Sequence, residues 1–486
     1  MRLKTTFVFG LIAGTAFIAG AEEFVTPGNG TQYNLNVLAE TSGSNVTKEA
    51  EGIYIISDDV TVSADDSFIL GEGVTSVKFG NNVTFRVNGY CEFDAGSGRT
   101  LFTRNQESDE PKGLLIAYDG ESNPFLHNID FEYAALRCFG NKGLSINECN
   151  FSHANGNMNS TGAIALGSGG AVFTITNCRF ENNTVPAIGG GANVAVGVTI
   201  SNCYFYNNNT SNSNKPQINI TVGGDLPIAI SNCYIKGGDL NKVGGIAIGN
   251  MLQIPGENKV LITDCEIIEN RYGITGIGPM NFEIRNNTIV DNNHETNANN
   301  GGSGISLSGA GTNLNAIISG NTIKNNLWGI TVINCNDVNL GQIGNENSPG
   351  NNVFENNANN GTPYDLYNNS NKTIYAQNNT WSVPEQTEEL IETVIFHQHD
   401  NSALGEVIFM PANAGNGVNV VENDEIRIEG NKVVLPYGKD TLVEIFALDG
   451  TLIEKGFSQE SVYSLENLAA GIYLVKVDNK ALKINI

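Results

Sequence analysis

The chain repeats one short pattern of apolar and polar positions. In five segments an apolar residue is followed three positions later by a cysteine, and two positions further by Phe or Ile. Later segments have asparagine in place of the cysteine, and neighbouring copies are 22 to 34 residues apart. The residues at this position are Cys149, Cys178, Cys203, Cys233, Cys265, Asn287, Asn321, Asn352 and Asn379. This period predicts stacked units, because one unit of this length cannot bury its apolar face alone.

Each repeat has the pattern of short strands rather than of a helix. The runs are rich in Ile, Val, Thr, Phe and Tyr and are bounded by Asn and Gly clusters. Ile175 and Cys178 are three positions apart, so a bend must lie between them if both point inward. Asn pairs such as 182–183 predict a second bend, and a third strand follows glycine, as in segment 304–309. Three strands and three bends per coil predict an all-β, right-handed parallel β-helix, with the Cys and Asn positions in one internal column.

Two segments outside this column have further strand patterns. Residues 53–96 alternate strands with Gly, Asp and Asn turns and include a DVTV strand, a GVTSVKF strand and a VNG turn. Segment 377–413 has an Asn-Asn-x-Trp motif, a short helical stretch and a last strand ending in Pro. They resemble the opening and closing coils of bacterial surface proteins of the right-handed β-helix class. The resemblance implies a β-helix over 53–413 after a lead-in or cap at 22–52. It leaves the activity open, because this scaffold carries enzymes and non-enzymes.

A separate module follows a linker at 413–417. Residues 418–486 contain short β runs with Asp-Gly and Gly turns, which predict a small all-β domain. This module resembles the type A C-terminal sorting domain of type IX secretion substrates in Bacteroidetes, an Ig-like β-sandwich. The matching positions are Gly450, Leu468, Gly471, Tyr473 and Lys476. The resemblance implies that the type IX machinery exports the protein to the cell surface. The alternative is a small β-sandwich that only caps or binds something.

Residues 1–21 predict a secretory signal, because a basic start is followed by an apolar stretch over 7–18 and small residues at 19–21. The apolar stretch is too short to span a membrane, and no other segment of the sequence qualifies. The formal net charge is −25, which disfavours nucleic acid and anionic lipid as partners. It is compatible with neutral sugars, cations or a basic partner. We therefore expect an exported protein without a membrane span.

Eight cysteines in an exported chain ordinarily indicate disulfides. Stacked column positions lie about 4.8 Å apart, however, which is wider than the ~3.8 Å between the Cβ atoms of a disulfide. The column cysteines are therefore expected to stay unpaired, and Cys91, Cys138 and Cys335 receive no role. No cofactor is expected, and no C-x-x-C pair supports zinc. Calcium at Asp58-Asp59 or Asp65-Asp66 stays open, although EF-hand spacing is lacking.

Candidate catalytic residues are few. An inverting glycoside hydrolase needs two carboxylates roughly 6.5–9.5 Å apart, and a polysaccharide lyase needs a base together with a cation or a neutralised carboxylate. The candidate acids near the column are Asp264, Glu266 and Asp291, and Glu266 is expected to point outward beside the inward Cys265. The repeated Asp-Asp pair, the Gly-His-Gly and the Arg-x-Lys run of pectin-cleaving hydrolases of this fold do not appear in the repeats at 145–381.

Two functions therefore stay open. The first is a non-catalytic, adhesin-like surface protein whose polar and aromatic faces hold a glycan or a host partner. The second is an extracellular lyase or glycoside hydrolase that acts on an acidic polysaccharide in a groove near 203–291. A groove in which two or more carboxylates converge with a base or a bound cation would favour the second.

Overall fold

The computed structural model describes residues 22–155 and 161–413, and in the C-terminal part 427–428, 432–435, 441–447, 451–458, 462–465, 468, 472–477 and 480–485. The chain divides into two compact units, Met1–Ala414 and Gly415–Ile486. The predicted signal at 1–21 lies outside the described residues. None of the helices in the described part is long and apolar enough to cross a membrane.

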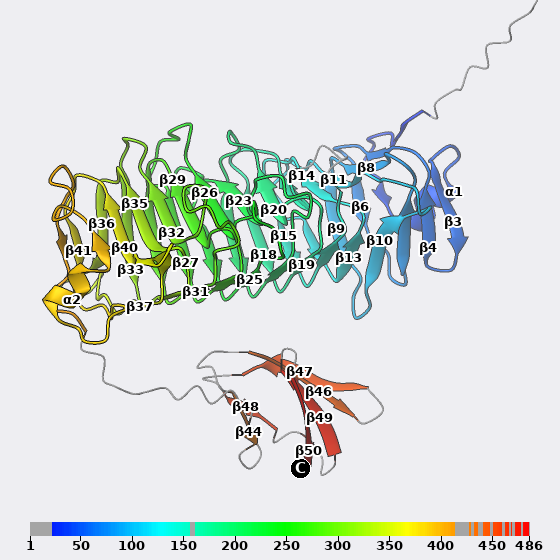
Figure 1. Ribbon diagram of the computed structural model, residues 1–486. Coiled ribbons are helices and arrows are strands. Elements are labelled where there is room, and N and C mark those ends of the chain that lie inside the picture. Colours follow the sequence, from blue (N-terminus) through cyan, green and yellow to red (C-terminus); the bar gives the residue numbers. More distant parts are fainter. Residues whose placement is uncertain are drawn as a thin grey trace, which may run out of the picture. The chain divides into compact units, whose positions relative to one another are not determined.

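The first unit is a right-handed parallel β-helix, so the predicted fold is confirmed (Figure 1). Three long sheets, designated A, B and C, run along it, and successive strands of a sheet come from successive coils. Sheet A contains β1 (Phe24–Val25), β5 (Val60–Val62), β8 (Thr84–Val87), β11 (Gly113–Ile116), β14 (Leu136–Cys138), β17 (Ile164–Leu166), β20 (Ile188–Gly190), β23 (Ile218–Thr221), β26 (Ile246–Gly249), β29 (Ile274–Ile277), β32 (Ser303–Ser308), β35 (Trp328–Ile333), β40 (Leu366–Asn369) and β42 (Ile395–Phe396).

Sheet B follows sheet A in each coil. It contains β2 (Gln32–Tyr33), β6 (Ser67–Ile69), β9 (Tyr90–Asp94), β12 (Phe125–His127), β15 (Gly143–Asn147), β18 (Val172–Thr176), β21 (Gly197–Ser201), β24 (Ile228–Ser231), β27 (Lys259–Thr263), β30 (Met280–Arg285), β33 (Leu314–Ser319), β36 (Asp337–Gly341), β41 (Ile374–Ala376) and β43 (Val407–Ile408).

Sheet C completes each coil. It contains β3 (Val46–Ala50), β4 (Ile53–Ile56), β7 (Ser76–Phe79), β10 (Thr100–Arg104), β13 (Ile129–Glu132), β16 (Asn150–Ser152), β19 (Arg179–Glu181), β22 (Tyr204–Tyr206), β25 (Tyr234–Lys236), β28 (Glu266–Ile268), β31 (Thr288–Val290), β34 (Thr322–Lys324) and β37 (Val353–Glu355). A short antiparallel hairpin, β38 (Ala358–Asn359) and β39 (Thr362–Pro363), precedes β40.

The bend between sheets B and C turns on one residue with left-handed backbone. It directly precedes the column position, as in Asn177 (φ 56°) and Asn286 (φ 55°). Asn accepts this conformation more readily than most residues, because its short side chain bonds nearby backbone. The bend interrupts the strand alternation, and Ile175 and Cys178 are therefore both buried although they are three positions apart.

Both ends of the β-helix are covered. At the N-terminal end, α1 (Leu35–Glu40) buries Leu35 and Leu38, and β3 pairs antiparallel with β4. Residues 22–52, expected to be a lead-in or cap, also contribute β1 and β2 to the parallel sheets; each strand is only two residues long, too short to show a pattern in the sequence. At the other end, α2 (Glu388–Glu392) buries Ile391. Such covers keep open sheet ends from pairing with another chain.

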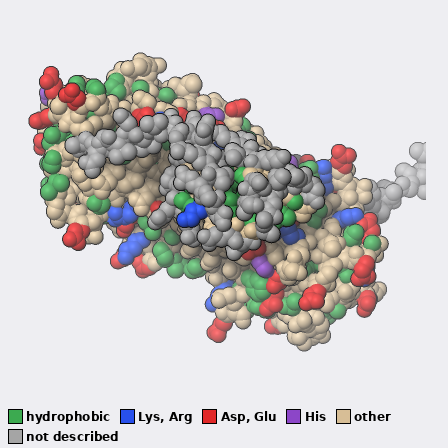
Figure 2. Space-filling model, turned by 90° about the horizontal axis from the view of Figure 1, so that it is seen from below, with side chains coloured by type: hydrophobic (Ala, Val, Ile, Leu, Met, Phe, Trp, Pro, Cys, Tyr) green, Lys and Arg blue, Asp and Glu red, His purple; other side chains and the backbone are tan. Residues whose placement is uncertain are grey.

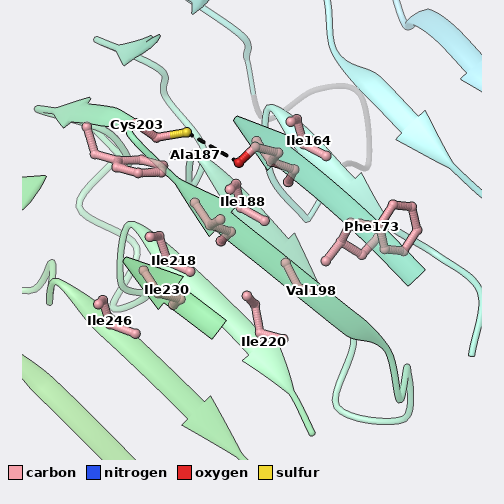
Figure 3. Close-up of a cluster of buried hydrophobic side chains, with 14 of the residues drawn as sticks. Ile164, Phe173, Ala187, Ile188, Val198, Cys203, Ile218, Ile220, Ile230 and Ile246 are labelled. Carbon is pink, nitrogen blue, oxygen red and sulfur yellow. Dashed lines mark hydrogen bonds between the residues drawn. The ribbon is translucent and has the colours of Figure 1, made fainter. Parts of the chain in front are cut away.

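The interior is filled by columns of apolar side chains. On sheet C, the rings of Phe131, Phe151, Phe180 and Phe205 stack nearly parallel, with centroids 4.8 to 4.9 Å apart. Figure 3 shows the same stacking from the other sheets, where Ile188, Ile218 and Ile246 come from three successive strands of sheet A. The strand spacing sets this distance. Each buried side chain of this size contributes about 1.5–3 kcal/mol.

The Cys and Asn positions of the repeat form one buried column. The backbone N–H of Cys149 donates to Sγ of Cys178 at 3.4 Å. The Cys203 thiol donates to the Ile175 carbonyl at 3.6 Å, the contact that is dashed in Figure 3. Further along, amides replace the thiols, and Asn287 Nδ2 donates to Asn321 Oδ1 at 3.0 Å. All eight cysteines are free. Burial raises the pKa of the Cys149 and Cys233 thiols, which keeps them protonated.

A second buried amide column lies at the bend between sheets C and A. It contains Asn183, Asn208, Asn270, Asn292, Asn326 and Asn357. One coil has glycines at this place, and Gln217 bridges the gap: its Oε1 accepts from Asn208 at 2.9 Å and its Nε2 donates to Asn270 at 3.0 Å. The column ends at buried Asp365, whose Oδ1 accepts from Asn357 at 3.1 Å. The sequence predicted a bend at the Asn pairs, but not this column.

The second unit is a small β-sandwich. A three-stranded antiparallel sheet contains β44 (Arg427–Ile428), β45 (Lys432–Val434) and β48 (Val462–Ser464). The other sheet has four antiparallel strands, in the order β47 (Leu452–Phe457), β46 (Leu442–Ala447), β49 (Ile472–Val477) and β50 (Lys480–Asn485). Both sheets contribute to one core, as Val433 and Val443 do.

The positions that resemble a sorting domain are partly described. Leu468 and Tyr473 pack against the core of the second unit, and Lys476 pairs with Glu444 at 2.8 Å. Gly450 and Gly471 lie outside the described residues. Leu468, Tyr473 and Lys476 therefore have structural contacts within the sandwich. These contacts do not by themselves assign a sorting role.

Candidate functional site

The three candidate carboxylates lie on sheet C and at its two bends. Asp264 occupies the bend before β28, and Glu266 is the first residue of β28. Asp291 occupies the bend after β31, in the next coil. Glu266 lies opposite Thr288 in register, so Asp291 lies three residues further along the strand direction. Three residue steps correspond to about 10 Å. The structure brings Asp264 and Glu266 to one coil and places Asp291 at the other end of the strand.

A row of stacked side chains covers the outer face of sheet C beside Glu266. The Arg179 guanidinium lies 3.9 Å from the centroid of the Tyr204 ring, and Tyr204 stacks on Tyr234 with centroids 5.2 Å apart. Arg179 also pairs with Glu181 at 2.6 Å. Burial raises the pKa of Tyr204, which opposes a role as a base at neutral pH. Because the rings of the row face one another, it offers hydroxyl edges rather than ring faces to a ligand.

Two adjoining hollows lie along the edge where the chain turns from sheet A to sheet B. Their volumes are about 370 and 400 Å³, both are open to solvent, and Asn313 lines both. The first hollow is lined by Gly311, Thr312, Asn313, Asn334, Cys335, Asn336, Asn369, Ser370, Asn371, Lys372, Ala403 and Leu404. The second is lined by Gln253, Ile254, Pro255, Gly256, Glu257, Asn258, Pro279, Met280, Asn281, Asn313 and Asn315.

Neutral amides are the commonest side chains in the lining of these hollows. Asn281, Asn315 and Asn336 form an external ladder over successive coils. Asn315 Nδ2 donates to Asn281 Oδ1 at 2.9 Å, and Asn336 Nδ2 donates to Asn315 Oδ1 at 3.1 Å. Asn313 and Asn371 are exposed, and their side-chain amides have no hydrogen-bond partner among the described residues. Since an amide offers both donors and an acceptor, these groups can bond hydroxyls of a ligand in either sense.

The hollows carry little net charge. Among their lining residues, only Glu257 and Lys372 are charged, and Glu257 pairs with Lys259 at 2.6 Å. On the part of the surface that Figure 2 shows, the acidic side chains are spread among uncharged ones. The lining can therefore hold a neutral, hydroxyl-rich ligand. It does not supply the two carboxylates that glycosidic hydrolysis requires.

The sequence predicted a candidate site on another face of the β-helix. It favoured acids near 203–291 on sheet C and its bends, whereas the hollows are built by turns from sheet A to sheet B between 253 and 404. Their signal in the sequence was a set of Asn-rich turns, such as 334–336 and 368–372, which also suits ordinary turn chemistry. Only the stacking of coils shows that these turns share one edge.

The cysteines without a role in the sequence pattern are also buried. Cys91 lies on β9 and Cys138 on β14. Cys335 lies in the turn after β35 and lines the first hollow. Its thiol donates to the Ile333 carbonyl at 3.5 Å, and burial raises its pKa to about 11. The Cys335 thiol is therefore protonated at neutral pH and acts as a small packed side chain.

Asp66, one of the acids considered for calcium, has structural contacts. Asp66 is buried and accepts from Thr26 Oγ1 at 2.6 Å and from three backbone N–H groups in residues 28–31 at 2.9 to 3.0 Å. Burial alone would raise the pKa of Asp66, but these hydrogen bonds hold it below its ordinary value. Asp66 thus organises the first turn. In the part of the chain that the structure describes, no group of three or more His, Cys, Asp or Glu is placed to hold a metal ion.

Comparisons with known proteins give a likeness in fold. No protein-family model matches this chain, and no curated protein matches it in sequence. Crystal structures of the periplasmic alginate epimerase AlgG are similar, with a TM-score of 0.40 and 11% identity over 78% of this chain and 83% of that chain. A double mutant of the same enzyme gives a TM-score of 0.44 at the same identity and coverage. A likeness at this identity concerns the fold alone.

Proposed function

We propose that this chain is an exported β-helix protein that binds a neutral carbohydrate outside the cell without cleaving it. The observation that supports this function is the pair of adjoining, amide-lined hollows between sheets A and B. Sugar hydroxyls both donate and accept, and the amides of Asn313 and Asn371 can meet either need. The stacked coils hold these turns in place, which lowers the ordering cost of binding. A glycan on a host surface would make the protein adhesin-like.

A lyase or hydrolase acting on an acidic polysaccharide is the alternative function. Its candidate groups are Glu266 and Asp291, and Arg179 is the cation of the same outward column, three strands away from Glu266. The observations support it less, because Asp291 lies about 10 Å along the strand direction from Glu266. Arg179 is already paired with Glu181. The net charge of −25 also repels an acidic polymer.

Binding should depend on the two exposed amides of the hollows. In the Asn313→Ala, Asn371→Ala double variant, we expect affinity for a neutral glycan to fall on the order of tenfold, since each lost hydrogen bond is worth about 0.5–1.5 kcal/mol. A neutral glycan array identifies the ligand, and isothermal titration calorimetry measures the change. The melting temperature should not change, because both side chains are exposed.

Asn141→Ala is the matched control, since Asn141 is exposed on the same edge but lies outside both hollows. It should bind like the wild type. Equal binding by the double variant would contradict the placement of the site. Release of reducing or unsaturated ends from polysaccharides, abolished by Glu266→Gln or Asp291→Asn, would instead establish the enzymatic alternative.

We further propose that the C-terminal unit is a type IX sorting domain that brings the β-helix to the cell surface. In a bacterium that has this secretion system, deletion of residues 418–486 should leave the protein in the periplasm. The two units have separate cores, so this truncation removes no side chain from the core of the β-helix. Cell fractionation and digestion of intact cells by an external protease measure the location.

A gain-of-function control accompanies the deletion. Residues 418–486 fused to a periplasmic reporter should carry the reporter to the surface. If the truncated chain still appears at the surface, the C-terminal unit is not the sorting signal and serves as a cap or a binding module.

A further inference from the structure

Four aromatic side chains cluster on the outer face of sheet A and at the bend that leads into it, near the C-terminal end of the β-helix. They are Trp328, Tyr364, Tyr367 and Phe396, and all are half-buried. Tyr367 on β40 lies opposite Phe396 on β42 and opposite Thr331 on β35. The preceding coils have Thr275, Ser306 and Thr331 in this outward column, so its aromatic residues begin at Tyr367.

The cluster is held in a defined arrangement. The Tyr367 and Phe396 rings stack with centroids 4.6 Å apart. Trp328 lies 4.6 Å from Tyr364 and 5.1 Å from Tyr367, in tilted and edge-on geometry. Its indole Nε1 donates to the Ala298 carbonyl at 3.0 Å, which fixes the ring. Aromatic rings that are already positioned lose little conformational entropy when a ligand covers them.

This cluster continues into the first hollow. Tyr367 and Asn369 are two residues apart on β40 and point to the same outer side, because Leu366 and Asn368 are buried. Two residue steps along a strand correspond to about 7 Å. Asn369 lines the first hollow. An elongated ligand can therefore contact the amides of the hollow and the aromatic rings at the same time.

The chemistry of the combined surface matches one class of ligand. A pyranose ring has polar hydroxyls at its edge and, where its substituents are equatorial, a continuous C–H face. The rings of the cluster pack against one another, so their outer edges provide apolar contact. Amides provide hydrogen bonds. Of the residues that line the first hollow, only Lys372 is charged. An anionic ligand would meet the net charge of −25 of the chain.

We propose that Trp328, Tyr364, Tyr367 and Phe396 form an aromatic subsite, next to the amide hollow, whose ring edges pack against the C–H face of a pyranose. One neutral oligosaccharide then occupies both, with one sugar in the hollow and a neighbouring sugar on the rings. This proposal rests on the proposed carbohydrate-binding function and adds a ligand class to it: unbranched chains of neutral sugars with equatorial substituents.

The test is titration of the full-length protein with cellooligosaccharides of increasing length, whose ring substituents are all equatorial. For the wild type, affinity should rise with chain length as the second subsite fills. In Tyr367→Ala this rise should disappear, with a loss of about tenfold for the longest saccharide. Tyr367→Phe keeps the ring and should stay within about twofold of the wild type. Tyr234→Ala removes a stacked tyrosine from sheet C and is the matched control, expected to bind normally.

Tryptophan fluorescence gives a second readout. The chain has two tryptophans, and Trp381 is only 2% exposed. In a Trp381→Phe background, where Phe occupies the same place as in other coils, the emission reports Trp328 alone. Saccharide binding should shift this emission, and the shift should be lost in Tyr367→Ala.

Two outcomes separate this inference from the proposed function. If glycan binding depends on Asn313 and Asn371 but neither Tyr367→Ala nor the Trp328 emission responds, the aromatic subsite is refuted and the function stands. If the wild type binds no neutral glycan, both are refuted. A dimer of the wild type that dissociates in Tyr367→Ala, seen by sedimentation velocity, would show that a second copy covers the rings and would also overturn the subsite.

Discussion

Replacing Asn321 by cysteine should destabilise the β-helix by about 3–6 kcal/mol, although cysteine occupies the same column five times in earlier coils. Asn321 Nδ2 donates to the Ile284 carbonyl at 2.9 Å and to Asn352 Oδ1 at 2.9 Å. Its Oδ1 accepts from the backbone N–H and the side-chain amide of Asn287 at 2.9 and 3.0 Å. A thiol fills the space but makes only weak hydrogen bonds, so several buried polar groups would lose their partners.

The reverse exchange is the matched control. Cys265→Asn should change stability by no more than about 1 kcal/mol, because its amide could donate to the Ile230 carbonyl, which the Cys265 thiol now approaches at 3.8 Å. Unfolding in guanidinium chloride, followed by circular dichroism, compares the two variants. Hydrogen exchange at the Asn287 amide should accelerate only in Asn321→Cys. Equal destabilisation by both exchanges would show that the column depends on side-chain volume rather than on hydrogen bonds.

The stability of the β-helix should fall between about pH 4 and pH 7 because of one buried carboxyl group. Asp365 is fully buried, and burial raises its pKa from 3.8 to about 7 in the folded chain. The folded state then binds more protons than the unfolded state throughout this range. The stabilising contribution is complete below pH 4 and is lost as the pH rises through 7. Over the whole pH range, the free energy of unfolding changes by about 4 kcal/mol.

The Asp365→Asn variant isolates this effect, since asparagine does not titrate. Oδ1 and Oδ2 of Asp365 accept from Asn357 and from the Ser382 backbone N–H, so asparagine loses one of these bonds at every pH. Calorimetric melting of both proteins should show the wild type losing stability relative to the variant from pH 4 to pH 7, and no further change above. Asp337→Asn replaces an exposed carboxylate on β36, and its stability should differ from that of the wild type by the same amount at every pH in this range. A constant difference for Asp365→Asn would exclude the buried, protonated carboxyl.

The repeat could be predicted from the sequence because the residues that define it lie within a few positions of one another. An apolar residue, a left-handed bend residue and a small column residue recur within a few positions, and strand stacking requires the same order in every coil. This identified the column from Cys149 to Asn379 and predicted its burial. The second column was not predicted, because Gln217 and Asp365 complete it from outside the Asn pairs. No local pattern shows that Gln217 bridges a coil with glycines.

The candidate site required more than local pattern. Asn313 and Asn371 are 58 positions apart, and nothing in the spacing of two turn asparagines indicates a shared hollow. Insertions of unequal length between strands determine which turns protrude and which leave a concave edge. The same holds for the aromatic cluster, since Trp328 and Phe396 lie on strands of different coils. Glu266 was a candidate because a carboxylate indicates possible catalysis from the sequence alone. Asparagines in turns do not indicate a binding site in this way, because asparagine is common in ordinary turns.

The amino-acid sequence alone determined the class of fold, the division into a β-helix and a small C-terminal β domain, and the inward column of thiols and amides. These follow from short-range periodicity, which each coil must satisfy to stack on the next. The tertiary structure alone decided where the surface is concave, which amides there keep unused hydrogen-bonding groups, and which rings gather beside them. Those features depend on residues tens of positions apart, and such residues become neighbours only after the coils have stacked.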